Sequence, residues 1–531
     1  MRILFTIFFS LSFSQFDLDP RMIGLSGAYT SVATGYHSIG INPASLSTNK
    51  ALSINIFSAN IFLVNDFMSV ELYNEMNGAD FEDPTAASYY PKDAILSQVD
   101  GNQITIESGW TSPLPALNFA YKSFGISMTN KTYMKVDIPK DVLTMMLYGN
   151  TNETLVFEFG GESISTNEIG FSYAHSFTLL EQPIQVGGTF KYLQGLLYLK
   201  ADDIYPDGSY FQTDENFFSG SGKYLVRQAF GGAGKALDFG VLVPNISGSG
   251  WSAGLSLINV GGSIKWDSEN LTRKMISNFE SQLPLRQNEY FYFDYNIEEI
   301  NAMDIINSED SSTEPFSSNS YKVGIFSDLP LCSQSTQTDL ICFDYNESGH
   351  PIPVSNTNLF STSDIKDLGD GSYLVPSDRL QSSQLQSQSS EDINLDYPSF
   401  LRIGASKVIQ KYGFFSIDAV TGFDDSFGNS NKFRLSIGTE ITRIHKNLPI
   451  RFGCSFGGRQ PSSYSIGIGW KVGPLSIDYG RKFYHGVILN KAKGVEYSIN
   501  MSLDFNNGSF KNIFKFNLPK IKFPKFPKMP D

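Results

Sequence analysis

The clearest regularity of the chain is a strict alternation of two kinds of side chain near its C-terminal end. Between residues 464 and 471 one set is large and apolar: Tyr464, Ile466, Ile468 and Trp470. The residues between them are small or charged: Ser465, Gly467, Gly469 and Lys471. Successive side chains of a β-strand point to opposite faces of a sheet, so each set lies on its own face. The same period of two recurs over 433–441 and 495–505, and it predicts strands rather than helices.

These predicted strands are about ten residues long, which is the length that a tilted strand needs to cross a bilayer. Short turn sequences at 445–447, 457–459 and 471–474 separate them, and aromatic residues near their ends are typical of membrane interfaces. Further alternating segments raise the expected number of strands to about fourteen. They lie at 51–58, 115–128, 169–177, 184–199, 237–243, 251–260, 321–326, 400–409 and 413–420.

The alternation also predicts how the strands assemble. Beyond the first residues, the sequence has no run of eighteen apolar residues that would make a helical membrane anchor. A chain that crosses a bilayer without helices must close its strands into a barrel, because every backbone group then finds a partner. We therefore expect an all-β fold, a transmembrane antiparallel β-barrel over 51–505. A soluble β-sandwich, with strands nearer about five or six residues, is the alternative.

Two parts of the chain depart from the strand pattern. Residues 15–50 are rich in glycine and small side chains and are expected to pack compactly rather than to span a membrane; taken alone, they could also be a Gly-rich entry into a sheet. Residues 267–398 are dominated by Ser, Asp, Asn and Gln, apart from the segment 321–326, and are expected to form long extracellular loops.

The first residues have the features of a secretory signal peptide. Met1-Arg2 is a short basic start, an apolar run follows over 3–13, and Ser12 and Ser14 are small residues suited to cleavage. We expect residues 1–14 to be removed and the mature chain to reach the bacterial outer membrane. The alternative is a buried first strand of a cytoplasmic protein, but residues 3–9 lack polar alternation.

The charge balance limits the partners. The net charge of −14 argues against nucleic acid, because counterion release requires clustered Lys and Arg. The expected surroundings are outer-membrane lipid, with hydrophobic small molecules and secretion or periplasmic proteins as further candidate partners. Residues 506–531 form a basic, Pro-rich periplasmic tail, which either contacts protein or anionic headgroups or is a disordered end.

Three cysteines are too few for a disulfide scaffold and lack the spacing of a zinc site. Cys332 and Cys342 lie about ten residues apart in one polar region of an exported chain, so we expect them to form one disulfide. Neither a metal nor a cofactor is expected.

Catalytic motifs are weak or misplaced, so we do not expect an enzyme. The match to a nucleophile elbow at 250–254 continues into a strand instead of a helix, and the five histidines are scattered. Inward-facing carboxylates could pair for acid–base chemistry, but basic residues share the same face and favour a lumenal ion-pair network. Its expected members are Arg402, Asp418, Arg434, Glu440, Arg451, Lys471, Asp478 and Glu496.

The N-terminal segment contains a recognisable motif. Residues 24–33 read Gly-Leu-Ser-Gly-Ala-Tyr-Thr-Ser-Val-Ala, and residues 39–46 contain the turn sequence Asn-Pro-Ala at 42–44. This pattern resembles the N-terminus of the FadL-like outer-membrane superfamily, including its PorV/PorQ branch. The segments 238–240, 254–262 and 448–453 are also similar to that branch.

The resemblance implies that the N-terminal segment is a plug inside the barrel, with Asn42, Pro43 and Ala44 in its turn. It also implies one of two functions. FadL-like members pass hydrophobic or small amphipathic solutes passively through a lateral opening beside the plug, whereas PorV-like members are secretion-associated or scaffold barrels that bind protein partners. An apolar pocket at the plug would favour transport, and its candidate residues are Ile39, Ile41 and Leu46. A polar, filled lumen would favour partner binding.

Overall fold

The computed structural model describes most of the predicted plug and barrel. Backbone and side chains are described at 19–48, 51–149, 153–203, 205, 208–212, 219–222, 224, 226–266 and 393–505. Strand backbone alone is described in addition at 13–14, 213, 217–218, 223, 225, 289–301, 321–327, 331–334, 340–345, 351–353, 366–367 and 372–374. Residues 1–12 of the expected signal peptide and the basic tail at 506–531 lie outside the described residues.

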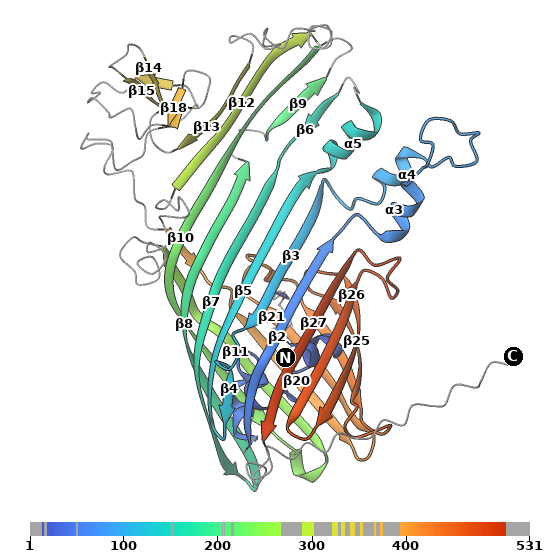
Figure 1. Cartoon of the computed structure of the whole chain (residues 1–531), viewed down its shortest axis with the longest axis vertical. Helices are drawn as coiled ribbons and strands as arrows, with labels where there is room; N and C mark the ends of the chain where they lie inside the picture. Colours follow the sequence, from blue (N-terminus) through green and yellow to red (C-terminus); the bar gives the residue numbers. More distant parts are fainter. Residues whose placement is uncertain are drawn as a thin grey trace, which may run out of the picture.

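The strands form a closed antiparallel barrel (Figure 1). With β3 and β4 counted as one interrupted crossing, fourteen strands make the ring, as the sequence pattern predicted. They are β2 (Leu52–Asn65), β3 (Gln103–Pro113) with β4 (Phe119–Tyr121), β5 (Phe124–Pro139), β7 (Gly160–Leu179), β8 (Gln182–Asp203), β10 (Phe217–Val243), β11 (Trp251–Trp266), β20 (Phe400–Ile409), β21 (Gly413–Gly422), β23 (Arg434–Ile441), β24 (Ile450–Gly457), β25 (Ser462–Val472), β26 (Leu475–Tyr484) and β27 (Gly494–Phe505). Pairing of β27 with β2 closes the ring.

The two faces of each strand have opposite character. On β25 the outward residues Ile466, Ile468 and Trp470 are 44 to 46% exposed, whereas the inward Ser465 is buried. On the adjacent β26 the inward Asp478 is fully buried. The barrel is thus apolar outside and polar inside, which excludes the alternative of a soluble sandwich, whose apolar face would be internal.

On one side the barrel wall is much taller than we expected from the length of the C-terminal strands (Figure 1). Strands β7, β8 and β10 have 20, 22 and 27 residues, while the ring strands β20, β21 and β23 to β27 have 8 to 12. Strand β12 (Glu289–Asn301) extends this wall by pairing with β10, and β13 (Tyr321–Ser327) pairs with β12. The expectation that 267–398 consists of loops apart from 321–326 was therefore wrong for 289–301.

Two further strand predictions were wrong, although the total of fourteen was right. Strand β3 was not predicted, because its polar residues interrupt the alternation of large apolar side chains. The segment 115–128, which was predicted as one strand, contains a break, the short β4, a turn and the start of β5.

Shorter elements complete the described structure. Helix α5 (Lys140–Tyr148) lies beside β6 (Thr154–Val156) and β9 (Tyr210–Thr213), and helices α3 (Val70–Met76) and α4 (Lys92–Leu96) lie on the other side of α5 (Figure 1). Strand β19 (Ile393–Asp396) pairs with β11, and β1 (Phe13–Ser14) pairs with β22 (Ser430–Asn431). Among the described residues, no helix is long and apolar enough to cross a membrane.

A separate five-stranded sheet contains the two cysteines that were expected to pair. It consists of β14 (Leu331–Gln334), β15 (Leu340–Tyr345), β16 (Pro351–Pro353), β17 (Lys366–Asp367) and β18 (Ser372–Leu374). In the β14–β15 register Cys332 lies directly opposite Cys342.

We predict a disulfide between Cys332 and Cys342. Directly opposite residues of antiparallel strands have Cα atoms roughly 4.5 to 5.5 Å apart, within the range that a disulfide bridges. The bond would stabilise this sheet by about 2 to 3 kcal/mol through loop closure. Mass spectrometry of unreduced peptides checks it, and two free thiols in freshly isolated protein would refute it.

The outward position of Ile468 gives a second prediction. Ile468→Arg places a charge on the apolar outer face near the middle of β25 and should cost about 2 to 4 kcal/mol of folding free energy in lipid. Val487→Arg, in the exposed turn between β26 and β27, is the matched control and should be nearly neutral. Equal effects in vesicle folding titrations would show that the outer face of β25 does not meet lipid.

Candidate functional site

Residues 19–48 fold inside the barrel as a plug (Figure 1). The plug contains α2 (Pro20–Gly24) and two 3₁₀ turns, η1 (Gly35–Ser38) and η2 (Pro43–Thr48). The carboxylate of Asp19 caps α2 by accepting hydrogen bonds from the backbone N–H groups of Arg21 (2.7 Å) and Met22 (3.1 Å). Almost every side chain of the plug is buried, so the plug fills the lumen at this level.

The plug contacts the wall where inward-facing wall positions are glycine. A Cβ atom at Gly187 would lie 2.5 Å from the carbonyl carbon of Pro43, and one at Gly480 would lie 2.6 Å from the carbonyl oxygen of Pro20. A Cβ atom at Gly404 or at Gly438 would likewise lie 2.8 Å from the Cβ atom of a plug residue. Any larger residue at these positions would push the plug away, so the glycines permit direct backbone contact.

Asp418 joins the middle of the plug to the wall. Its carboxylate accepts hydrogen bonds from the backbone N–H groups of Tyr29 (2.9 Å) and Thr30 (2.8 Å) and lies 3.5 Å from the guanidinium of Arg402. Arg402 also donates to the carbonyl oxygen of Gly27 at 2.8 Å. All of these groups are buried, so the ion pair holds residues 27–30 in place without access to water.

A second ion-pair network holds α2. Asp478 lies between two guanidinium groups, 2.9 Å from Arg21 and 2.7 Å from Arg451, and Arg451 also pairs with Glu440 at 2.8 Å. Because Asp478 is fully buried, it depends on both arginines to offset the loss of hydration.

The other expected lumenal charges are more dispersed. Glu496 accepts from Asn60 (2.9 Å) and from the Tyr484 hydroxyl (2.6 Å), and it lies 3.8 Å from Lys482. Arg434 is buried and lines a lumenal cavity. Lys471 lies at the exposed end of β25.

The Asn42-Pro43-Ala44 turn lies against β10. The amide of Asn42 donates to the carbonyl oxygens of Thr30 (3.3 Å) and Val241 (3.1 Å), and its oxygen accepts from the N–H of Ala44 (3.2 Å). One side chain therefore links two parts of the plug to the wall.

The three apolar residues expected at one pocket do not come together. Ile39 lines a cavity beside the plug. Ile41 and Leu46 are fully buried and pack in two different apolar clusters, one with Met22 and Leu25 and the other with Ile39. The expectation of a single pocket from these residues was therefore wrong, because two of them hold the plug together.

The wall is interrupted between β3 and β4, beside the plug. Pro113 pairs with Thr129 of β5, and Phe119 pairs with Ile126, so the five residues 114–118 face only two residues, 127 and 128. Residues 115–117 are exposed, and the backbone of Ala116 is left-handed, with φ of 61°. The segment 114–118 therefore leaves the ladder as a bulge, which we call the wall interruption.

The side chain of Asn118 stabilises the wall interruption from inside the barrel. It donates to the carbonyl oxygens of Leu114 (2.9 Å) and Met128 (2.8 Å) and accepts from the N–H of Met128 (3.1 Å). These bonds replace the ladder hydrogen bonds that the bulge removes.

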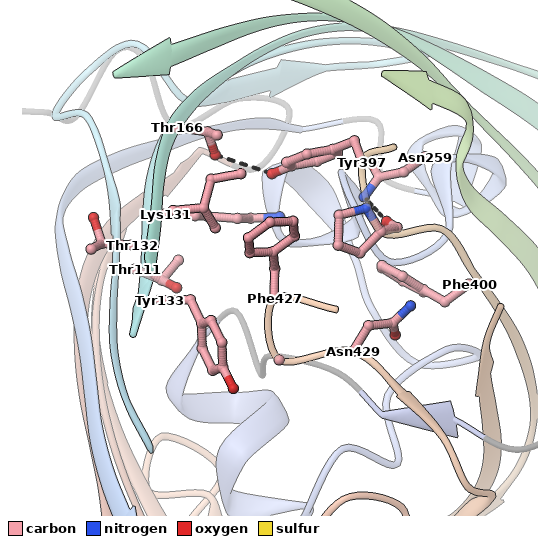
Figure 2. A pocket seen from close by; sticks show the side chains of 13 residues that line it. Thr111, Lys131, Thr132, Tyr133, Thr166, Asn259, Tyr397, Phe400, Phe427 and Asn429 are labelled. Atoms are coloured by element: carbon pink, nitrogen blue, oxygen red, sulfur yellow. Dashed lines mark hydrogen bonds between the residues drawn. The ribbon is translucent and has the colours of Figure 1, made fainter. Parts of the chain in front are cut away.

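Two cavities lie in the lumen near the wall interruption. The first, the aromatic cavity, is surrounded by the rings of Tyr133, Tyr397, Phe400 and Phe427 (Figure 2). The second, the plug cavity, lies between the plug and the wall interruption, and Asp19, His37, Ile39, Pro113 and Asn118 are among its lining residues. Lys131 lines both cavities, so they are neighbours.

A buried charge cluster lies where the two cavities meet. Glu168 pairs with Lys131 (2.7 Å) and Lys191 (3.3 Å) and accepts a hydrogen bond from the Tyr397 hydroxyl (2.7 Å). Lys191 also pairs with Asp238 at 3.1 Å. Sequence reasoning missed this cluster, because only the polar alternation of β5, β7 and β8 marks its residues as inward-facing.

His37 and Asp19 form the charged edge of the plug cavity. The Nδ1 atom of His37 lies 3.2 Å from the Asp19 carboxylate. Burial raises the pKa of Asp19, but His37, Arg21 and the Met22 N–H together hold that pKa below its ordinary value. Asp19 is therefore ionised, and the ring nitrogen that faces it carries a proton.

Comparisons with known proteins give distant matches. A family of unknown function (DUF5723) matches residues 43–223, and no curated protein matches the chain. Among solved structures, the chain is similar to the toluene transporter TbuX of Ralstonia pickettii, with 10% identity, 94% of this chain and 100% of that chain covered and a TM-score of 0.41. It is also similar to the toluene transporter TodX of Pseudomonas putida, with 9% identity, 93% of this chain and 99% of that chain covered and a TM-score of 0.41. A FadL homologue of Pseudomonas aeruginosa matches with 10% identity, 93% of this chain and 100% of that chain covered and a TM-score of 0.39. These matches do not address the PorV/PorQ branch.

The ion pairs around Asp478 predict how the plug is held. Asp478→Asn leaves Arg21 and Arg451 without the carboxylate between them and should destabilise the protein by about 3 to 5 kcal/mol. Hydrogen–deuterium exchange of the α2 amides should rise. Asp504→Asn is the control, because Asp504 lies 3.9 Å from Arg21 and is 37% exposed, so its loss should cost less than about 1 kcal/mol. Unchanged exchange in Asp478→Asn would show that the ion pairs do not hold α2.

Proposed function

We propose that this chain is an outer-membrane β-barrel that passes hydrophobic or small amphipathic solutes passively. In this proposal the solute enters the lumen from the tall end, reaches the cavities above the plug and leaves sideways through the wall interruption. The observation that carries the proposal is the position of the plug cavity, which is lined both by the plug residue His37 and by Pro113 and Asn118 at the wall interruption.

An outer-membrane location is supported by the distribution of polar and apolar side chains. Outward residues such as Ile468, Phe452 and Leu435 are 44 to 45% exposed and apolar, which suits contact with lipid chains. The expected signal peptide would direct such a barrel across the inner membrane.

The lumen supports a sideways path rather than a straight one. The plug is held by hydrogen bonds to Asp418 and Arg402 and by the buried Arg21–Asp478 ion pair, so its removal from the lumen during transport would break a buried ion pair and leave buried polar groups without partners. The aromatic cavity offers apolar surface to a solute, as ligand sites usually do. The inward carboxylates described here are engaged in ion pairs, which supports a role other than catalysis.

The alternative is a secretion-associated or scaffold barrel that binds protein partners. It is favoured by the polar, tightly packed contact between plug and wall and by the tall wall of β7, β8 and β10 (Figure 1). Such a barrel would need neither the aromatic cavity nor the wall interruption.

Removal of the wall interruption tests the proposal. Deletion of 115–117 leaves Leu114 and Asn118 opposite 127 and 128, so that the ladder becomes continuous. Uptake of labelled toluene and labelled dodecanoate is measured in intact Gram-negative cells that lack their own hydrophobe transporter. We expect the wild-type chain to raise uptake of at least one of these probes above that of empty cells, and the deletion variant to lose this increase.

Two controls separate transport from the alternative. Deletion of 24–45, most of the plug, should raise leakage of small polar solutes from reconstituted vesicles, because the lumen is then open. Deletion of 115–117 should leave that leakage unchanged. If neither the wild-type chain nor its plug deletion changes hydrophobe uptake, transport is refuted and the scaffold function is favoured.

A further inference from the structure

The plug cavity is polar, in contrast to the aromatic cavity beside it. Hydrogen-bonding side chains contribute most of its lining residues, and they come from the plug, the wall interruption, β2, β5, β7, β8 and β27. Three of them are deeply buried: His37, Ser58 and Asn500 are 4%, 1% and 1% exposed. A pure hydrocarbon in this cavity would leave these groups without hydrogen bonds.

Each of these three side chains has one polar atom without a partner. The Nε2 atom of His37, the hydroxyl oxygen of Ser58 and the amide oxygen of Asn500 make no hydrogen bond to the described residues. Buried polar groups in proteins are almost always hydrogen-bonded, and an unpaired one is costly. Three such atoms around one cavity indicate that a hydrogen-bonding group occupies it.

The chemistry of these atoms defines that group. Nδ1 of His37 lies 3.2 Å from the Asp19 carboxylate and donates to it, and Nε2 is the ring nitrogen left for the cavity, where it can accept or donate. Asn500 donates its amide N–H to the Tyr36 hydroxyl at 2.7 Å, which leaves its oxygen as an acceptor. The Ser58 hydroxyl can donate or accept. The cavity therefore favours an occupant that donates hydrogen bonds.

The charges around the cavity exclude an ionic occupant. Lys131 and Lys191 are neutralised by Glu168 and Asp238. The Asp19 carboxylate is already engaged by the backbone N–H groups of Arg21 and Met22 and by Nδ1 of His37. A carboxylate would have to displace Glu168 from its lysines, and an ammonium group would have to displace Lys131. Both exchanges lose a buried ion pair, so an uncharged occupant is favoured.

We infer that the plug cavity binds the uncharged, hydrogen-bond-donating head of an amphipathic molecule, such as an alcohol or a primary amide. The apolar part of the same molecule lies toward the aromatic cavity, because the two cavities share Lys131. This inference rests on the proposed function and narrows its solute class to neutral amphiphiles rather than hydrocarbons or fatty acids.

Fluorinated probes that differ only in the head group test the inference. 4-Fluorobenzyl alcohol donates and accepts a hydrogen bond, 4-fluorobenzyl methyl ether only accepts, and 4-fluorotoluene does neither. Affinities are measured by ¹⁹F NMR titration of the full-length protein in lipid nanodiscs. We expect the alcohol to bind at least tenfold more tightly than the ether and the toluene, and 4-fluorobenzoate to bind no better than the toluene.

A matched pair of variants ties this preference to the cavity. Ser58→Ala removes one cavity hydroxyl and should reduce the alcohol-to-toluene preference at least threefold. Ser53→Ala is the matched control. Ser53 lies on the same strand, and its buried hydroxyl also has no partner among the described residues, but Ser53 does not line the cavity. Its replacement should leave the preference unchanged.

The outcomes separate this inference from the proposed function. Equal affinities for the three uncharged probes, or equal effects of the two variants, would overturn the inference, even if deletion of 115–117 still abolished hydrophobe uptake. A preserved alcohol preference without any uptake would uphold the binding site and refute transport.

Discussion

Contact between the plug backbone and glycine positions in the wall is the constraint on which the lumen depends. At Gly187 and Gly480 the plug is too close for any Cβ atom, so the wall must lack side chains there. This close contact brings plug amides within reach of Asp418 and brings Arg21 within reach of Asp478. The buried Arg21–Asp478 ion pair therefore follows from the close packing, and the plug cavity lies where plug residues face the wall.

The lumen combines two environments that would be incompatible in a uniform pore. Next to the aromatic cavity, Lys131, Glu168, Lys191 and Asp238 form a neutral cluster in which no charge lacks a partner. The cluster keeps the space between the cavities polar without giving it a net charge. A solute that moves between them exchanges apolar contacts for hydrogen bonds, and an amphipathic molecule can make both at once.

The sequence predicted the barrel well, because alternation is a local property that an inward or outward orientation imposes on every second residue. The faces of Ile468 and Asp478 were predicted from this alternation alone. Strand membership was harder to predict: in β3 Ser108 interrupts the apolar face between Ile106 and Trp110, and 115–128 alternates across a break that no local pattern marks. The candidate site was mostly beyond prediction. His37, Ser58 and Asn500 come from three distant segments, and only the closed ring brings them around one cavity.

The wall interruption also affects how copies of the chain meet one another. A gap in a β-ladder normally exposes free backbone donors and acceptors, and such an edge invites pairing with another chain. Here the Asn118 amide occupies the carbonyl oxygens of Leu114 and Met128 and the N–H of Met128. Backbone hydrogen bonds also join Ala116 and Asn118 to Asn55 of β2. Together these bonds leave fewer backbone groups at the wall interruption open to pairing with another chain.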